Sequence, residues 1–340
     1  MGGVRLAVVG ATGEVGRETL RILAERAFPY SELRLFASER SAGTRVAVGE
    51  REHVVEALAE TSFAGLDIAL FAAGADISRR FAPAAAAAGC RVVDKSSAFR
   101  EDPEIPLVVP EVNPEDLAHV ENRGIVASPN CATTPLVMAL APLDRRYRAL
   151  RVVVSTYQSV SGAGRKGIEE LERQLSLPPE EREASRRCFS RAIAFNCVPH
   201  IDAFLPDGST KEERKTVHES RKILHRPDLR VSATTVRVPV WRGHALSVNV
   251  QFERRPELSE ARRILADAPG VTVLDDPARP LFPTSLDAER HDGALVGRIR
   301  LDDSVEWGLN LWLVVDNLRK GAALNAVQIA EALSARNQRR

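Results

Sequence analysis

The chain has 340 residues, with 47 lysines and arginines against 46 aspartates and glutamates, so its formal net charge is +1. Apolar residues make up 44% and charged residues 27% of the sequence, as is ordinary for a globular protein and unlike a disordered chain. Because acidic and basic residues are interleaved throughout, we expect neither nucleic acid nor a membrane to be the main partner. At this length two domains are expected.

The cysteines and the first residues bear on metal binding and location. Four cysteines occur, at Cys90, Cys131, Cys188 and Cys197. None is paired in the C-x-x-C manner of a metal site, so we expect no metal and reduced thiols. Residues 1–6 carry neither a secretory nor a myristoylation signal, and the small-residue run 82–89 is too short to span a bilayer. We therefore expect a cytoplasmic protein.

The first predicted strand, residues 5–9, ends in a glycine-rich turn, Gly10-Ala11-Thr12-Gly13-Glu14-Val15-Gly16, and a helical pattern follows. Strand, glycine turn and helix in this order are the setting of a dinucleotide site, because the helix N-terminus then faces the pyrophosphate. The spacing G-x-x-G-x-x-G is a variant of the usual fingerprint, and a purely structural turn would also keep glycines. Its place at the start of an alternating strand and helix pattern favours a nucleotide.

A second predicted strand, residues 33–37, is followed by Ser38-Glu39-Arg40-Ser41. At this position an acidic residue serves the ribose hydroxyls of NAD, whereas a cation serves the 2′-phosphate of NADP. Arg40 and the two serines favour NADP, and Glu39 favours NAD. We expect NADP.

Further strand-like runs at residues 68–71, 92–93 and 107–109, with helical runs between them, predict a doubly wound parallel sheet of Rossmann type. After residue 131 the character changes. Long β-rich runs occupy residues 151–157 and 232–240, and residues 246–252 alternate strictly between apolar and polar. Such alternation is typical of an antiparallel sheet with one covered face.

We therefore predict an α/β N-terminal domain joined to an α+β domain with a largely antiparallel sheet. The final helix has apolar residues at helical spacing (323, 327, 330 and 333), and we expect it to return to the first domain. The predicted domains are residues 1–129 completed by helix 319–340, and residues 130–318.

The stretch Ser128-Pro129-Asn130-Cys131-Ala132-Thr133-Thr134-Pro135 is where we expect the chemistry. It lies between two apolar runs and reads as a strand-to-helix turn, with Cys131 near the helix start. A thiol at a helix N-terminus ionises more readily, and the free N–H groups there, with the Asn130 amide, could hold an oxyanion. The alternative is that Cys131 is a buried, inert thiol.

Other candidates are individually ambiguous. Arg100 follows the predicted strand at residues 92–93 and could hold an anion, or it could be a surface arginine. His244 lies in a short link between two strands, where a histidine is often merely exposed. Glu212 and Lys215 lie one helical turn apart in a charged stretch that could be a solvated helix face.

Taken together, the chain resembles the aspartate-β-semialdehyde dehydrogenase family nearly end to end. The motifs that carry the resemblance are Gly10-Ala11-Thr12-Gly13-x-x-Gly16, Arg40-Ser41-Ala42-Gly43, Ser96-Ser97-x-x-Arg100, Pro129-Asn130-Cys131, Tyr157-Gln158-x-x-Ser161-Gly162-Ala163-Gly164, Asn196-x-x-Pro199-His200-Ile201-Asp202, Glu212-Glu213-x-Lys215, Arg237-Val238-Pro239, Gly243-His244 and Asp316-Asn317-Leu318-Arg319-Lys320-Gly321-Ala322-Ala323. The chain departs from the family pattern at Lys95, Ala132 and Pro135, which bears on local geometry and rate rather than on reaction class.

The resemblance implies roles for these residues. Cys131 would be the nucleophile and His244 the acid/base. The substrate-binding residues would be Arg100, Asn130, Gln158, Glu212, Lys215 and Arg237, with Arg100 and Lys215 on the phosphate. The NADP site would be lined by Gly10, Thr12, Gly13, Glu14, Val15, Arg40, Ser41, Ser161, Gly162 and Asn317. A homodimer or homotetramer is expected.

The implied reaction is reduction of aspartyl-4-phosphate by NADPH to aspartate semialdehyde, through a cysteine thioester, in lysine, threonine and methionine biosynthesis. In it His244 would protonate the collapsing oxyanion. One alternative is the same chemistry on N-acetyl-glutamyl phosphate. Another is a non-catalytic binding paralogue with the same fold.

Overall fold

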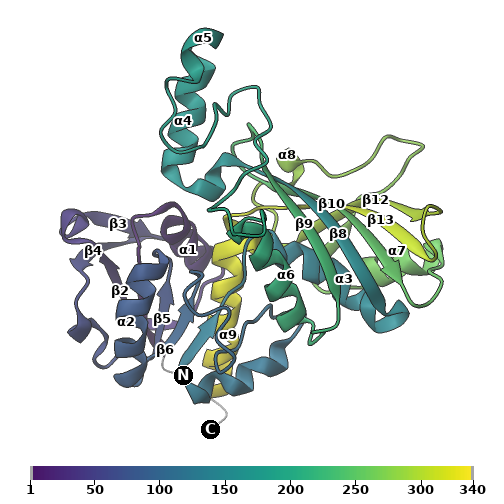
Figure 1. Ribbon diagram of the computed structural model, residues 1–340. Helices are drawn as coiled ribbons and strands as arrows, with labels where there is room; N and C mark the ends of the chain where they lie inside the picture. Colours follow the sequence, from purple (N-terminus) through teal and green to yellow (C-terminus); the bar gives the residue numbers. More distant parts are fainter. Residues whose placement is uncertain (1–2, 338–340) are drawn as a thin grey trace. The chain divides into compact units, whose positions relative to one another are not determined.

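The computed structural model describes residues 3–337 and divides the chain into two compact units (Figure 1). The first unit comprises Met1–Asn130 together with Ala322–Arg340, and the second comprises Cys131–Gly321. The later part of the chain thus re-enters the first unit.

The first unit is built on a sheet with the strand order β3-β4-β2-β1-β5-β6-β7. Its strands are β1 (Val4–Val9), β2 (Tyr30–Ala37), β3 (Arg45–Val48), β4 (Arg51–Ala57), β5 (Ile68–Phe71), β6 (Arg91–Asp94) and β7 (Ile125–Ala127). All neighbours pair in parallel except β3 and β4, which form an antiparallel hairpin at one edge. The central strand β1 is buried on both faces, as a parallel sheet covered by helices requires.

In the described part of this unit the α-helices are α1 (Glu14–Glu25), α2 (Ala75–Ala87) and α9 (Leu324–Asn337). Short 3₁₀ helices are η1 (Glu39–Ser41), η2 (Glu60–Phe63) and η3 (Pro114–Asn122). Leu23 of α1 and Val327 of α9 are fully buried in one apolar cluster with Leu6 of β1. The last helix is therefore part of this core, because its apolar stripe has no other surface to cover.

Two predicted details are wrong. Residues 107–109 do not form a strand, because Pro106 and Pro110 flank them; Leu107 makes only an isolated bridge to Ala127. The connection between β2 and β5 contains the β3–β4 hairpin and two short 3₁₀ helices rather than an α-helix, since the run His53-Val54-Val55 favours an extended chain.

The second unit is built on a sheet with the order β11-β12-β13-β10-β8-β9. Its strands are β8 (Ala149–Gln158), β9 (Arg230–Arg237), β10 (His244–Phe252), β11 (Val271–Val273), β12 (Ala294–Asp302) and β13 (Gly308–Val315). The four central strands pair antiparallel, while the outer pairs β8–β9 and β11–β12 are parallel. The predicted fold class is confirmed: a parallel-sheet domain is joined to one whose sheet is mixed and largely antiparallel.

Helices of the second unit include α3 (Thr133–Tyr147), α4 (Arg165–Leu175), α5 (Pro179–Arg182), α6 (Lys211–Ile223), α7 (Leu258–Ala266) and α8 (Ser285–Ala288), with the 3₁₀ helix η4 (Val160–Ala163). The short π-helix η5 (Arg319–Ala323) begins in this unit and ends in the first. Helix α3 contacts α6, α7 and the strands β10, β12 and β13. The alternation along β10 is as predicted, since Leu246, Val248 and Val250 are buried whereas Ser247 is exposed.

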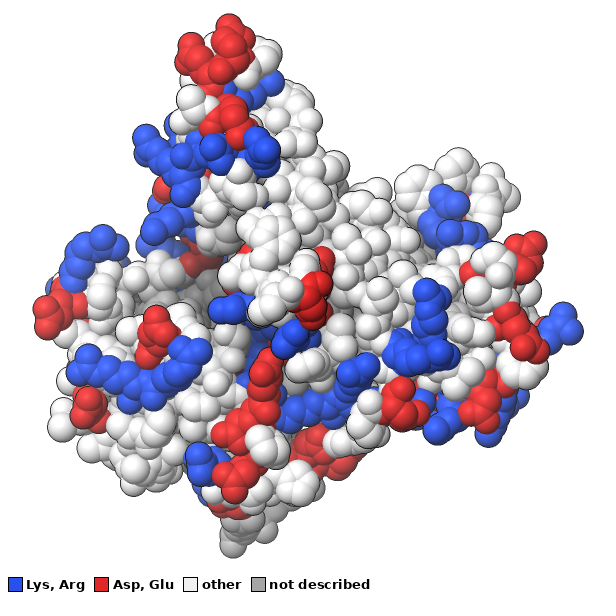
Figure 2. Space-filling model, in the orientation of Figure 1, with Lys and Arg blue, Asp and Glu red and all other residues white. Residues whose placement is uncertain are grey.

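The polar segment at residues 176–187 forms an excursion that includes the short helix α5. On the face shown in Figure 2 acidic and basic side chains are interspersed, in keeping with the net charge of +1. Within residues 3–337, no helix has both the length and the apolar character needed to cross a membrane.

Candidate functional site

Cys131 lies just before α3, whose N-cap is Ala132 and whose third residue is Pro135. Pro135 thus falls in the first helical turn, where its missing N–H costs no hydrogen bond. The thiol is partly buried. Gly321 packs against it, since a Cβ added at that glycine would lie 3.1 Å from the Cys131 Cβ. The Cys131 thiol therefore lies at a helix N-terminus, the end of a helix that carries partial positive charge.

His244 begins β10 and is completely buried, so the interpretation of an exposed turn histidine is wrong. Its Nδ1 lies 3.1 Å from the Ser159 backbone nitrogen, which donates to it, and 3.0 Å from the Ser159 Oγ. Its Nε2 is buried and has no hydrogen-bond partner among residues 3–337. Burial, with a smaller effect of the Arg237 charge, holds the pKa of His244 well below its ordinary value of 6.5. The imidazole is therefore neutral at pH 7.

Asn317 connects several segments around this histidine. Its Oδ1 accepts the Gly243 backbone N–H at 2.9 Å and the hydroxyls of Ser159 at 3.1 Å and Ser161 at 3.2 Å. Because a backbone N–H can only donate, the amide oxygen must face Gly243, which leaves Nδ2 to donate to Ser161 at 3.0 Å. The Asn317 side chain is thus engaged inside the second unit.

A chain of polar contacts links β8 to α6. Gln158 Nε2 donates to one Glu212 carboxylate oxygen at 3.2 Å, and Lys215 Nζ donates to the other at 3.1 Å. Lys215 also contacts Asp202 at 2.8 Å. Burial alone would lower the pKa of Lys215, but Glu212 and Asp202 outweigh it and the pKa is raised. Glu212 is only 5% exposed, so the interpretation of this pair as a fully solvated face is wrong.

Arg237, the last residue of β9, is 5% exposed and donates from Nη1 to the Ser159 carbonyl at 2.7 Å. Its Nε is buried without a hydrogen-bond partner in the described part of the chain. Burial lowers the pKa of Arg237, opposed first by Glu212 and then by Cys131. The nucleophile candidate and this guanidinium are therefore within electrostatic range of each other. A buried guanidinium with an unused donor is suited to hold a carboxylate.

Gly162 shows how closely these groups converge. A Cβ added there would lie 2.7 Å from Arg237 Nη1 and 3.2 Å from His244 Nε2, so no larger residue fits without displacing one of them. Ser161 and Gly162 lie in η4. In the second unit the structure therefore gathers the side chains of His244, Arg237 and Ser161 around one exposed glycine.

In the first unit, Arg100 is 7% exposed and donates from Nη2 to the Lys95 carbonyl at 2.7 Å, so it is not a surface arginine. Lys95 Nζ in turn donates to the Pro129 carbonyl at 2.7 Å, and Asn130 is buried. Lys95, one of the residues that differ from the family pattern, thus connects Arg100 by hydrogen bonds to the segment that precedes Cys131.

The glycine turn lies where a dinucleotide would need it. Gly10 has φ +84° and follows β1, and Gly13 is the N-cap of α1. A Cβ at Gly16 would lie 2.1 Å from the Gly10 carbonyl oxygen, so only glycine permits this packing of helix on turn. Thr12, Glu14 and Val15 are partly exposed at the helix start, and Arg40 is exposed after β2, close in sequence to Ser41.

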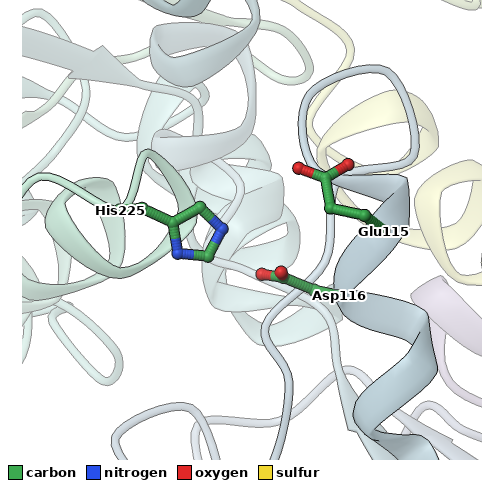
Figure 3. A group of neighbouring side chains, drawn as sticks. All are labelled: Glu115, Asp116 and His225. Carbon is green, nitrogen blue, oxygen red and sulfur yellow. The ribbon is translucent and has the colours of Figure 1, made fainter.

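Figure 3 shows three side chains that could each offer a metal-ligand atom: Glu115, Asp116 and His225. Glu115 and His225 are exposed, and Asp116 already accepts the Asn113 side-chain amide at 2.7 Å. The two acids belong to the first unit and the histidine to the second. We assign no metal to them.

Three residues of the site were not singled out from the sequence. Ser159 contacts His244, Asp202 pairs with Lys215, and buried Asp316 accepts from Arg242 Nε at 2.8 Å and from the Arg290 backbone N–H at 2.8 Å. Asp202 and Asp316 are named positions of two of the motifs, and Ser159 is an unspecified position of a third, but none of the three was given a role. Nothing in their spacing indicates which partner they contact, because those partners are distant in sequence.

Comparison with known proteins agrees with this geometry. Residues 5–120 match the family model described as semialdehyde dehydrogenase, NAD binding domain, and residues 140–320 match semialdehyde dehydrogenase, dimerisation domain. Aspartate-semialdehyde dehydrogenase of Aquifex aeolicus is 52% identical over 97% of this chain and 98% of its own. The Bacillus subtilis enzyme of the same name is 45% identical over 98% and 99%.

Solved structures agree with these matches. Aspartate semialdehyde dehydrogenase II of Vibrio cholerae, complexed with ASA, superposes with a TM-score of 0.94 at 45% identity, over 98% of both chains. The Candida albicans enzyme with NADP superposes with a TM-score of 0.77 at 26% identity, over 98% of this chain and 99% of its own. The chain therefore belongs to the aspartate-semialdehyde dehydrogenase family, a family of oxidoreductases.

Proposed function

We propose that the protein reduces L-aspartyl-4-phosphate to L-aspartate 4-semialdehyde with NADPH, within lysine, threonine and methionine biosynthesis. The observation that carries this proposal is the buried pair of opposite charges, Arg237 and Glu212. An amino acid with a free α-carboxylate and α-ammonium needs one cation and one anion in its site. Family membership and the similarity to a structure complexed with ASA support the same substrate.

The same pair argues against N-acetyl-glutamyl phosphate. Acetylation converts the ammonium into a neutral amide, which would leave the Glu212 carboxylate without its charge partner in the substrate. Gln158 Nε2 already donates to Glu212, so this carboxylate is oriented before substrate arrives. A non-catalytic paralogue would have no need of a buried, neutral His244 near Arg237.

The first unit fits NADP. The N–H groups at the start of α1 and the glycine turn would hold the pyrophosphate, with Gly10, Thr12, Gly13, Glu14 and Val15 lining it. Exposed Arg40 and half-buried Ser41 would hold the 2′-phosphate. The nicotinamide end would lie against Ser161 and Gly162, with Asn317 behind them. The first unit would thus be the NADP-binding domain and the second the catalytic and dimerisation domain.

The residues then divide the chemistry as follows. The Cys131 thiolate attacks the acyl carbon, the C–O bond to phosphate breaks, and a thioester on Cys131 remains. Arg100 and Lys215 would bind the phosphate, and Arg237 the α-carboxylate. When bound, NADPH supplies the hydride that reduces the acyl carbon. Asn130 and His244 stabilise the oxyanion until the carbonyl re-forms and the Cys131 thiolate is released.

We further propose a homodimer or homotetramer, supported by the match of residues 140–320 to a dimerisation domain. Half-polar strands such as β10, with Asn249 and Gln251 only partly buried, offer a surface that a second copy would cover.

The covalent step can be tested without phosphate. Purified protein given aspartate semialdehyde and NADP⁺ should produce about one NADPH per active site and then stop, because the thioester has no phosphate to accept it. Mass spectrometry should find the acyl group on the Cys131 peptide. Absence of the burst, or acylation of another cysteine, would contradict the mechanism. The Cys131→Ala variant is the control.

A further inference from the structure

The segment at residues 187–194 is fastened to helix α4 at both of its ends. Glu170 of α4 is 1% exposed, and its Oε2 accepts the backbone N–H groups of residues 187 and 188 at 2.8 Å and 2.5 Å. Gln174, one helical turn later, is fully buried, and its Oε1 accepts those of residues 193 and 194 at 2.7 Å and 3.1 Å. Because both acceptors are buried, moving the segment away from α4 would leave polar atoms unsatisfied.

The ring of Phe189, between these two anchor points, lies against Arg237. The guanidinium carbon of Arg237 is 5.8 Å from the ring centre, within the range of a cation–π contact. The ring also contacts α4, since a Cβ added at Gly167 would lie 3.1 Å from Phe189 Cζ. It packs against the apolar cluster that contains Val160 and Leu171. Phe189 thus connects the anchored segment and α4 to the guanidinium.

Arg237 is poorly hydrated for a charged side chain. It is only 5% exposed, and burial lowers its pKa. Its Nη1 donates to the Ser159 carbonyl at 2.7 Å, while its Nε is buried without a hydrogen-bond partner among residues 3–337. A guanidinium shielded in this way attracts a carboxylate more strongly than an exposed one, because the surrounding dielectric is lower and salt ions screen it less.

We propose that Phe189 is a positioning residue: held on α4 by Glu170 and Gln174, its ring covers the Arg237 guanidinium and shields it from water and salt. The inference rests on the proposed function in one respect, the assignment of the substrate α-carboxylate to Arg237. The contact between Phe189 and Arg237 does not depend on that assignment.

In the proposed reaction this cover acts on binding rather than on the chemical step. The α-carboxylate does not react, so a weaker contact with it should raise KM and leave kcat nearly unchanged. Phe189→Ala would open the guanidinium to water. Phe189→Leu would keep an apolar cover without an aromatic face. Tyrosine is unsuitable as the conservative replacement, because its hydroxyl would extend from Cζ toward Gly167.

The first test compares the wild type with Phe189→Ala and Phe189→Leu in the phosphate-dependent oxidation of aspartate semialdehyde. Phe189→Ala should raise the KM for aspartate semialdehyde by about tenfold, the cost of a weakened charge-assisted contact, and change kcat and the KM for phosphate by less than about twofold. Its KM should also rise more steeply than that of the wild type between about 0.1 M and 1 M NaCl, because salt screens exposed charges. Phe189→Leu should lie near the wild type. A KM unchanged in Phe189→Ala, or raised equally in Phe189→Leu, would overturn the proposal.

The cover can also be measured without substrate. Phenylglyoxal modifies guanidinium groups, and peptide mass spectrometry identifies the modified arginines. Arg237 should react faster in Phe189→Ala than in the wild type by roughly threefold or more, because the variant loses the cation–π contact and the cover. Phe195→Ala is the matched control, since the Phe195 ring also faces an arginine, Arg182 at 4.6 Å, but is 72% exposed. It should leave the reactivity of Arg237 and the kinetics unchanged. An equal rate at Arg237 in Phe189→Ala and the wild type would count against the cover.

The anchoring by α4 is tested with Glu170→Gln. The single oxygen of an amide cannot accept both from Gln174 Nε2, which donates to Glu170 Oε1 at 3.1 Å, and from the backbone N–H groups. Amide hydrogen exchange at residues 187 and 188 should be faster, and the KM for aspartate semialdehyde should rise as in Phe189→Ala. Unchanged exchange and KM would refute the anchoring.

The proposed function and this inference fail separately. A wild type without phosphate-dependent activity, in which Phe189→Ala nevertheless exposes Arg237 to phenylglyoxal, would refute the proposed function alone. An active wild type, with KM and Arg237 reactivity both unchanged in Phe189→Ala, would refute only the role of Phe189.

Discussion

The Gln158 side-chain amide donates to Glu212 at 3.2 Å, joining the end of β8 to the first turn of α6. The other Glu212 oxygen accepts from Lys215, which also pairs with Asp202. One carboxylate thus connects the proposed amino-acid site to the proposed phosphate site. Substitutions in the two sites should nevertheless separate, because Arg237 and Lys215 would contact different parts of the substrate.

Lys215→Ala should raise the KM for inorganic phosphate in the oxidative direction by roughly tenfold or more, the cost of one charge-assisted hydrogen bond, and change that for aspartate semialdehyde by less than about twofold. Arg237→Lys should raise the KM for aspartate semialdehyde and leave that for phosphate nearly unchanged, since lysine cannot make the two-pronged contact with a carboxylate. Steady-state kinetics with each substrate varied in turn measure both. The control is Lys211→Ala, an exposed lysine at the start of the same helix. If Lys215→Ala behaves like Lys211→Ala, no phosphate site exists there.

Among the four cysteines, Cys131 should be alkylated first. Burial raises the pKa of Cys90 to about 12, and burial together with Glu170 raises the pKa of Cys188, so both thiols are protonated at pH 7. Cys131 instead lies at the start of α3, where the helix N-terminus carries partial positive charge and favours the thiolate. Brief treatment with iodoacetamide followed by peptide mass spectrometry should show Cys131 labelled and activity lost in parallel. Loss of activity with Cys131 unlabelled would rule out its role.

Replacing Arg40 should change cofactor choice. Arg40→Ala should raise the KM for NADPH by roughly tenfold to a hundredfold and leave that for NADH nearly unchanged, because only NADPH carries the 2′-phosphate. Arg45→Ala, which removes another exposed arginine of the same unit, should alter neither. If the wild type used NADPH and NADH equally well, Glu39 would offset Arg40, and the predicted selectivity for NADPH would be wrong.

Burial of neutral His244 should make folding stability depend on pH. Its folded-state pKa lies well below 6.5, so below pH 6.5 the unfolded chain binds a proton that the folded protein does not. Stability should therefore fall as pH decreases from 6.5 toward the folded-state pKa, by about 1.4 kcal/mol per pH unit from this group. Urea unfolding at pH 7 and pH 5 should show a smaller loss in His244→Asn than in the wild type. His119→Asn, at an exposed position, is the control. Equal losses in wild type and His244→Asn would contradict the buried neutral state.

Periodicity and composition were enough to predict both sheets and the strand–turn–helix around Gly13 and Cys131. These features depend on local signals: alternation, glycine spacing, and the residues at a helix start. Residues 107–109 show the limit, because an apolar run between two prolines has the composition of a strand and cannot pair as one.

The contacts within the site depend on partners far apart in the chain. His244 looked like an exposed turn residue, yet it starts a central strand and is fully buried between η4 and the Asn317 segment. Ser159 carries no signal of its own, because a serine beside Gln158 could face any direction. Arg100 and Glu212 were equally ambiguous, since burial of a charge depends on tertiary packing rather than on local sequence.

The central claim is most directly tested by phosphate-dependent reduction of NADP⁺ by the purified protein, with aspartate semialdehyde and N-acetyl-glutamate semialdehyde compared side by side. We expect turnover with aspartate semialdehyde that requires phosphate. The kcat/KM for the acetylated substrate should be at least about a hundredfold lower, because Glu212 would then lose the ammonium group of the substrate and keep only Lys215 as a charged partner. The Glu212→Gln variant should show a smaller difference in kcat/KM between the two semialdehydes. Preference for the acetylated semialdehyde, or turnover that does not depend on phosphate, would contradict the account.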